Sequence, residues 1–151
     1  MPLTKSQVNR AGSVLRDWLG GMEDLDDRQQ EALLVVDQWR SEHATPLARA
    51  NNELSSMLRA EQYPVQVSQR LKRLATILDK LRREPTMALS RMQDIGGCRA
   101  IVDDIAQLRA IQQRLIHNRP LARLSDYVAT PRPSGYRAVH VVVEYDGRAI
   151  E

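Results

Sequence analysis

Three side chains suited to chemistry stand close together in the last third of this 151-residue chain: Tyr136, Arg137 and His140. They follow residues 131–135, where two prolines flank an arginine and a Ser-Gly pair gives a turn. The β-branched residues beyond them predict a strand over 137–145. In an extended strand Tyr136 and His140 share a face with the small Ala138 between them, which leaves room for a flat ligand. The pattern indicates a ligand-binding loop, with an ordinary hairpin arm as the alternative.

A second candidate is the basic segment over residues 68–83, whose spacing predicts one helix. Its apolar stripe is formed by Leu71, Leu74, Ile77, Leu78 and Leu81. The polar side chains off that stripe are Arg70, Lys72, Arg73, Thr76 and Lys80. Cations near a helix N-terminus oppose the helix macrodipole, whereas a bound polyphosphate would relieve that repulsion and accept from free backbone N–H groups. A phosphate site is therefore predicted, and a solvated basic face is the alternative.

Asp94 lies just before Gly96-Gly97 and a predicted buried strand over 98–102. Glycines allow a backbone to approach a ligand closely. Mg²⁺ prefers one or two carboxylates together with phosphate oxygens and water. A carboxylate at this strand edge is therefore a candidate magnesium ligand.

The other patterns predict the elements that must position these residues. Helices are expected over 4–19, over 29–59 with a break or kink at Pro46, and over 104–117. Short strands are expected over 122–124 and 148–151, and Asp146-Gly147 predicts a type I′ hairpin between the last two strands. Since that second strand is cut off at Glu151, we expect the chain to be a fragment of a longer protein.

Composition narrows the class of protein. A chain of 151 residues suffices for one domain with a core. A net charge of +3 and a pI near 9.3 suit a phosphate-bearing ligand without demanding a nucleic acid. The single cysteine, Cys98, cannot form an internal disulfide, and no segment has the pattern of a signal peptide or membrane span. We expect a cytoplasmic protein without membrane association.

The order and spacing of these motifs resemble the synthetase domain of the RelA/SpoT family, which transfers pyrophosphate from ATP to the ribose 3′-hydroxyl of GDP or GTP and so makes the alarmone (p)ppGpp. The resemblance covers most of the chain from about residue 35. It is carried by Arg70-Leu71-Lys72 with Thr76 and Lys80, by 94–99, by Asp126-Tyr127 and by 131–140, while Glu151 begins the family's Glu-x-Gln-x-Arg-Thr. It implies an α+β fold with a small mixed, nucleotidyltransferase-like sheet flanked by helices. Residues 1–60 would form a helical region packed on a synthetase core over 61–151, incomplete at its C-terminal end.

The resemblance also implies roles for individual residues on the donor side. ATP would be held by Arg70, Lys72, Thr76, Lys80 and Arg99. Asp94 would bind Mg²⁺, and Glu151 would be either the second acidic group at the metal or the base for the acceptor hydroxyl.

On the acceptor side, Tyr136 would stack on guanine, Arg132 would meet the acceptor's phosphates, and His140 would help to order the transferring group. Catalysis would thus depend on Asp94, His140 and Glu151.

Departures from the family pattern leave alternatives open. Ser125 stands where many members carry a lysine or an acid, and Arg132, Thr76 and Ala138 replace a usual lysine, serine and serine. Long members of the family also carry a hydrolase domain. We expect none here, because the N-terminal helices are too short for it and lack its His-Asp metal signature, and this favours a small stand-alone synthetase. The alternatives are a toxin-like relative that modifies adenine nucleotides or the tRNA 3′ end and is neutralised by an antitoxin protein, and an inactive nucleotide-binding module.

Overall fold

The computed structural model describes residues 2–18, 20 and 23–151. Its helices are α1 (Lys5–Arg16), α2 (Asp27–Ser41), α3 (Ala44–Ala60), α4 (Leu74–Arg83), the short 3₁₀ helix η1 (Leu89–Arg91) and α5 (Ile105–Asn118). Its strands are β1 (Val67–Leu71), β2 (Gly96–Ala100), β3 (Leu121–Asp126), β4 (Val139–Tyr145) and β5 (Arg148–Ile150). The expected mixed sheet flanked by helices, with a helical lead-in, is confirmed.

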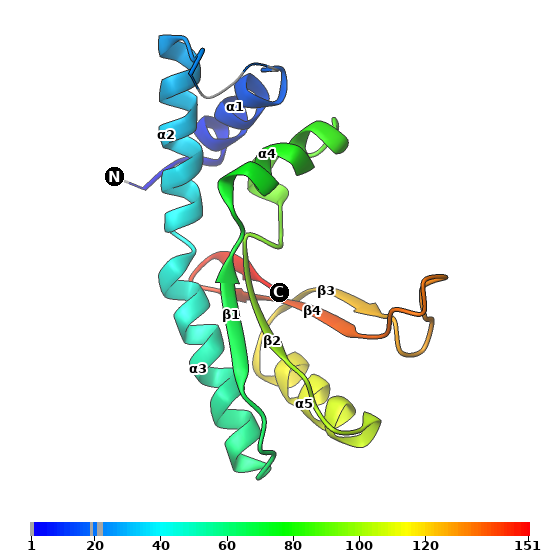
Figure 1. Cartoon of the computed structure of the whole chain (residues 1–151). Helices are drawn as coiled ribbons and strands as arrows, with labels where there is room; N and C mark the ends of the chain where they lie inside the picture. The colour runs from blue at the N-terminus through cyan, green and yellow to red at the C-terminus, as the bar shows by residue number, and fades with distance from the viewer. Residues whose placement is uncertain (1, 19, 21–22) are drawn as a thin grey trace.

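The five strands form one sheet in the order β1-β2-β5-β4-β3. All neighbours are antiparallel except β2 and β5, which pair in parallel at Gly96 and Ile150. Since β5 has only three residues, it joins the two halves of the sheet at one end. Beyond that junction β1 and β2 diverge from β3 and β4 (Figure 1).

Helix α3 runs along one side of the sheet, and α2 continues its line past the end of the sheet beside α1 and α4, with a break between the two helices (Figure 1). The break lies at Glu42 and His43, ahead of the proline that was expected to cause it. Pro46 occupies the first turn of α3, where the missing N–H costs no intrahelical hydrogen bond. The predicted interruption is confirmed, but it lies three residues before the predicted position.

Three apolar clusters hold the elements together. The first joins α1, α2 and α4 through Val8, Leu15, Val36, Trp39, Ile77 and Leu81. The second seats α3 on the sheet through Leu47, Ala50, Val143, Tyr145 and Ile150. The third packs α3 against α5 through Leu54, Met57, Leu58 and Ile111. Helix α3 thus connects the N-terminal helices to the sheet, and α4 connects them to the basic segment 68–83.

Local signals account for several element ends. Thr4 and Asp26 cap α1 and α2 with complete capping boxes, and Asp104 accepts from the Gln107 N–H at the start of α5. Positive φ angles of 50° at Asp146 and 74° at Gly147 fit the predicted type I′ turn. The expected end of the first helix at Leu19 and part of the Gly20-Gly21 stop lie outside the described residues.

The single helix predicted over 68–83 is wrong. Residues 67–71 form β1, which pairs with β2 in antiparallel register from Val67–Ala100 to Leu71–Gly96. Only residues 74–83 are helical, and there the apolar stripe is buried at Ile77, Leu78 and Leu81. Arg70 and Lys72 therefore do not lie on a helix, and the macrodipole argument does not apply to them.

None of the helices in the described residues has the length and apolar character that a membrane span needs.

Candidate functional site

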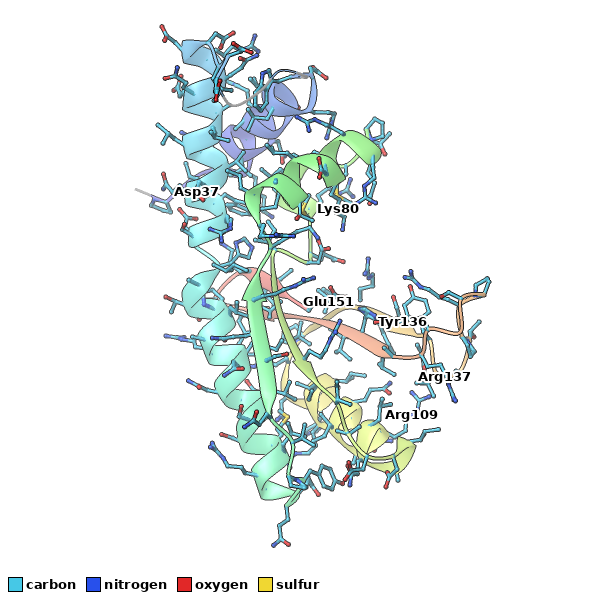
Figure 2. All side chains as sticks on the ribbon, in the orientation of Figure 1. Asp37, Lys80, Arg109, Tyr136, Arg137 and Glu151 are labelled. Atoms are coloured by element: carbon cyan, nitrogen blue, oxygen red, sulfur yellow. The ribbon has the colours of Figure 1, made fainter. Side chains whose placement is uncertain are left out.

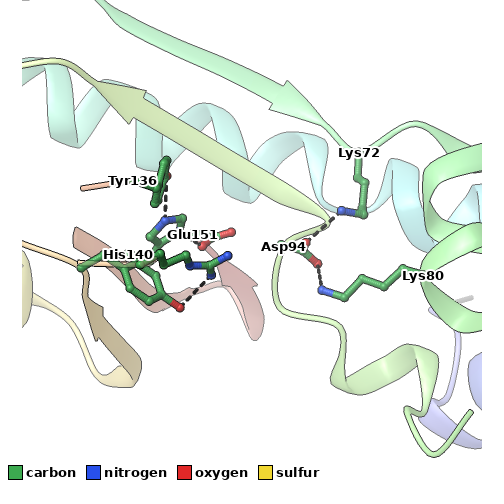
Figure 3. Close-up of polar contacts among 8 residues, drawn as sticks. Lys72, Lys80, Asp94, Tyr136, His140 and Glu151 are labelled. Atoms are coloured by element: carbon green, nitrogen blue, oxygen red, sulfur yellow. Dashed lines mark hydrogen bonds and ion pairs between the residues drawn. The ribbon is translucent and has the colours of Figure 1, made fainter. Parts of the chain in front are cut away.

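Asp94 is held between two lysines that come from different elements (Figure 3). Its Oδ2 accepts from Lys72 Nζ at 2.9 Å and its Oδ1 from Lys80 Nζ at 3.0 Å. All three side chains are largely buried, with exposed fractions of 12%, 19% and 25% for Lys72, Lys80 and Asp94. Burial alone would raise the pKa of Asp94, but the hydrogen bonds from both lysines outweigh it and hold the pKa below its usual value. The cluster carries two cations for one anion.

The backbone around Lys72 is fixed from two sides. Its N–H donates to the Ile95 carbonyl at 2.7 Å, which extends the β1–β2 ladder by one bond. Its carbonyl accepts from Arg40 Nε of α2 at 2.8 Å. Lys80 is placed by α4, whose neighbouring Ile77 and Leu81 are fully buried. The lysines therefore approach Asp94 from a fixed strand end and a packed helix.

A second group links Tyr136, His140 and Glu151. The Tyr136 hydroxyl lies 3.0 Å from His140 Nε2, and His140 Nδ1 is in close contact with Glu151 Oε1. An ionised carboxylate only accepts hydrogen bonds, so Nδ1 carries the proton and Nε2 of a neutral ring accepts from the tyrosine. The ring of His140 is thereby oriented by both neighbours.

Glu151 ties this group to the start of β2. Its N–H donates to the Gly96 carbonyl at 3.1 Å, and its carbonyl accepts from the Cys98 N–H at 2.8 Å. Asp94 lies two residues before Gly96 in the chain. Glu151 lies between Tyr136 and the lysine-bearing elements in both side-chain views (Figures 2 and 3). The two groups are therefore neighbours at the junction of the two halves of the sheet.

Arg132 and Tyr127 extend the second group outward. Arg132 Nη2 donates to the Tyr127 hydroxyl at 2.8 Å. The guanidinium carbon lies 4.3 Å from the ring centroid of Tyr127 and 5.7 Å from that of Tyr136. Such positions give cation–π attraction. The arginine is thus attached to both rings.

A cavity of about 720 Å³ opens between the two halves of the sheet. Five predicted site residues line it: Arg70, Arg99, Tyr136, His140 and Glu151. Of the residues that the structure describes, Asp94, Lys72, Thr76, Lys80 and Arg132 are not part of its lining. The residues predicted for the site therefore line this cavity only in part. Arg70 and Tyr136 share a cavity, and Asp94 lies outside its wall beyond Glu151.

The sequence pattern of the family described as "Region found in RelA / SpoT proteins" matches residues 69–151, which are 83 of the 151 residues. The chain belongs to the RelA/SpoT family. The expected resemblance is confirmed, and the matched region contains every residue proposed for the site.

Individual RelA/SpoT relatives agree with this membership. A GTP pyrophosphokinase of Bacillus subtilis (strain 168), YjbM, is 30% identical over 135 residues, covering 80% of this chain and 59% of the relative. The B. subtilis small alarmone synthetase 1 bound to its product pppGpp matches at a TM-score of 0.59 and 27% identity, over 72% of this chain and 64% of that one. A GTP pyrophosphokinase family protein of Streptococcus pneumoniae gives the same TM-score and identity, with coverage of 72% and 60%. The chain thus spans less than two thirds of the length of these relatives.

RelA/SpoT membership raises the question of a divalent metal, and the carboxylates present can be tested for it. No group of three or more His, Cys, Asp or Glu able to hold a metal occurs in the described part of the chain. Each oxygen of Asp94 accepts from one lysine, so a metal would share this carboxylate with the two ammonium groups unless these move to other acceptors. Phosphate oxygens are such acceptors, and Mg²⁺ takes one or two carboxylates alongside them. The carboxylates present therefore fit a divalent metal only together with phosphate oxygens as further ligands.

Two residues near the site were quoted in the motif but given no role from the sequence, Asp126 and Tyr127. Asp126 accepts from Arg109 Nη1 at 2.6 Å and from the N–H groups of Val128 and Ala129. An aspartate that accepts from backbone N–H groups two and three residues on is a common turn device, and this signal was present in the sequence. The side chain of Tyr127 contacts Arg132, Tyr136 and His140, which lie five to thirteen residues later, and these contacts depend on the path of the intervening loop.

Proposed function

We propose that this chain carries out ATP-dependent pyrophosphate transfer to the ribose 3′-hydroxyl of GDP or GTP, which makes (p)ppGpp. The observation that carries the proposal is the adjacency of two chemically different groups. A two-lysine cluster on Asp94 stands beside a Tyr136–His140–Glu151 chain, with Glu151 hydrogen-bonded to β2 two residues after Asp94. The names of the similar proteins support the same reaction.

The donor side is proposed to hold the triphosphate of ATP. Lys72 and Lys80 can turn from Asp94 to phosphate oxygens without leaving their elements, because both side chains are long and their backbones are fixed. Arg70 and Arg99, on neighbouring strands, add positive charge at the cavity wall. Thr76 stands one turn before Lys80 on α4 and is proposed to add a hydroxyl contact. Mg²⁺ held by Asp94 would supply further neutralisation of the phosphate charge, and of the two roles open to Glu151 we propose that of the base.

The acceptor side is proposed to hold the guanine nucleotide. Tyr136 has 39% of its surface exposed and lines the cavity, so its ring is available for stacking on a base. Arg132, beside that ring, is placed to meet the acceptor's phosphates. His140 orients Glu151 through Nδ1 and is proposed to order the transferring group.

The transfer itself requires one bond to form and one to break. The acceptor's 3′-oxygen attacks the β-phosphorus of ATP, and the bond from that phosphorus to the bridging oxygen of the α-phosphate breaks, so AMP leaves with the electron pair. The hydroxyl proton passes to the Glu151 carboxylate, which lines the cavity and contacts His140. Phosphoryl-type transfers depend mainly on alignment of the reacting groups and on neutralisation of the phosphate charge. The lysines and arginines of the donor side are proposed to provide both.

The test is a panel of acceptors offered to the chain with Mg²⁺ and ATP labelled in its γ-phosphate. Label is expected on GDP or GTP, and Asp94→Asn is expected to lower that transfer at least 100-fold. Arg49→Ala, which removes an exposed ion pair with Asp146, is the matched control and should leave the rate unchanged. Label on AMP or on tRNA instead would support the toxin-like alternative. Guanine-nucleotide binding without labelled product would support the inactive module.

A further inference from the structure

We propose that Tyr127 is a positioning residue that holds the whole acceptor side of the site in its binding geometry. The inference rests on the proposed function and deepens it, since it concerns how the same site selects and orients its guanine nucleotide. The observation behind it is that one side chain without an assigned role touches each of the three residues proposed for the acceptor: Arg132, Tyr136 and His140.

The backbone of Tyr127 is fixed where β3 ends and β4 begins. Its N–H donates to the Ala138 carbonyl at 2.8 Å, which continues the β3–β4 ladder past its last regular pair, Asp126–Val139. The preceding Asp126 is itself anchored by Arg109 of α5 at 2.6 Å. Its carboxylate also closes the following turn through Val128 and Ala129. The backbone of Tyr127 is therefore held by the sheet on one side and by the Asp126 turn on the other.

The side chain of Tyr127 reaches two rings at once. Its ring centroid lies 6.0 Å from that of Tyr136, with an interplanar angle of 61°, and 5.5 Å from that of His140, with an angle of 82°. Both are edge-to-face arrangements, which are the favoured geometry for aromatic pairs. Tyr127 thus limits the rotation of Tyr136 and supports His140 from the side.

The hydroxyl of Tyr127 has a separate task. It accepts from Arg132 Nη2 at 2.8 Å, while the guanidinium carbon lies 4.3 Å from the same ring. The hydrogen bond from Arg132 also holds the pKa of the Tyr127 phenol below its usual value. In the exposed loop 131–137 the Arg132 N–H donates to the Tyr136 carbonyl at 3.3 Å, and the contact with Tyr127 fixes the guanidinium end of the side chain near the ring of Tyr136.

Holding these side chains in place before binding matters because a bound ligand would otherwise have to remove their conformational freedom. A ligand that must immobilise a mobile ring or guanidinium loses affinity, and a preorganised site avoids that loss. Tyr136 and Arg132 are exposed and belong to a loop without regular structure. Tyr127 therefore sets how well a base and a phosphate are received together.

Two substitutions separate the ring from the hydroxyl. Tyr127→Phe keeps both aromatic contacts and removes the acceptor for Arg132, so GDP should bind about 2- to 10-fold more weakly while guanosine, which lacks phosphates, binds as before. Tyr127→Leu also removes the two edge-to-face ring contacts, so the binding of both GDP and guanosine should weaken. Neither change should alter binding of a non-hydrolysable ATP analogue. Tyr63→Phe, a tyrosine packed in the α3–α5 cluster, is the matched control and should change none of the three.

Calorimetric titration of the wild-type chain and these variants with the three ligands gives the answer. Unchanged GDP affinity in Tyr127→Phe would overturn the role of the hydroxyl, and equal losses for GDP and the ATP analogue in Tyr127→Leu would show a purely structural residue. If the wild type binds GDP normally and a variant gives one of these two results, the positioning role is overturned and the proposed function still stands. A wild type that binds the ATP analogue but neither GDP nor guanosine would overturn both proposals.

Discussion

At the scale of the residue, Asp94 is held in place by two cations, and its proposed role as a metal ligand starts from that position. Its two lysines keep it ionised and fix its position. The sequence placed Asp94 at a glycine-rich strand edge, and the structure agrees, because β2 begins at Gly96. Its pairing with Lys72 and Lys80 was not predicted, because the sequence pattern had placed both lysines on one helix, whereas Lys72 follows β1 and Lys80 lies on α4.

The depressed pKa of Asp94 has a consequence for stability against acid. A carboxyl group with a lower pKa in the folded state contributes stability that is fully present above its unfolded pKa, about 3.9, and is lost as the pH falls through the folded pKa. Asp94→Asn should therefore cost about 1–3 kcal/mol in the free energy of unfolding at pH 7. Urea unfolding between pH 7 and pH 2.5 should show the two proteins converging only below pH 4. A gap that is constant down to pH 2.5 would contradict the ion pairing.

Tyr136 provides the second prediction at this scale. Its ring lies at the cavity wall and is partly exposed, so Tyr136→Ala should remove about 1–3 kcal/mol of stacking from the acceptor. That corresponds to about 5- to 150-fold in the dissociation constant of GDP. The affinity for an ATP analogue, measured in the same titrations, should change less than 2-fold. Equal losses for both nucleotides would argue against the stacking role.

At the scale of the element, the segment from β1 to α4 explains what a local pattern cannot give. Helical periodicity was satisfied over 74–81, and extending it backward to residue 68 was wrong because Val67 and Leu71 also fit a strand that packs on α3. Pairing with β2, about thirty residues later, decides between the two. By contrast, the Asp146-Gly147 turn and the helix over 105–118 were predictable, since their signals lie within a few residues.

Helix α2 is expected to act on the donor side through Arg40. Its Nε holds the Lys72 carbonyl, so Arg40→Ala should free the end of β1, weaken binding of an ATP analogue about 2- to 10-fold and leave GDP binding unchanged. The lost charged hydrogen bond should also cost about 1.5–3 kcal/mol of stability. Calorimetric titration and urea unfolding measure the two effects.

Arg49→Ala is the control for Arg40→Ala, because its ion pair with Asp146 is exposed and should be worth at most about 1 kcal/mol. Identical behaviour of the two variants in both assays would remove Arg40 from the site.

At the scale of the whole molecule, the site forms where the two halves of the sheet meet. Residues from 70 to 151 are brought together because the short β5 joins β2 to β4 and leaves a cavity beyond the junction. The order of the motifs predicted this convergence through the family resemblance. It could not predict that Asp94 lies outside the cavity wall, because that depends on how far the halves diverge. Nor could it predict that Tyr127 connects the acceptor residues, because that depends on the path of the loop between β3 and β4. The division of the chain at residue 60 stays a prediction.

The most direct measurement is a crystal structure of the chain with Mg²⁺, a non-hydrolysable ATP analogue and GDP bound together. We expect the guanine against the ring of Tyr136, the triphosphate between Lys72 and Lys80, and the β-phosphate and 3′-hydroxyl facing each other beside Glu151. Two nucleotides bound on separate surfaces, or a triphosphate with no contact to either lysine, would contradict the account.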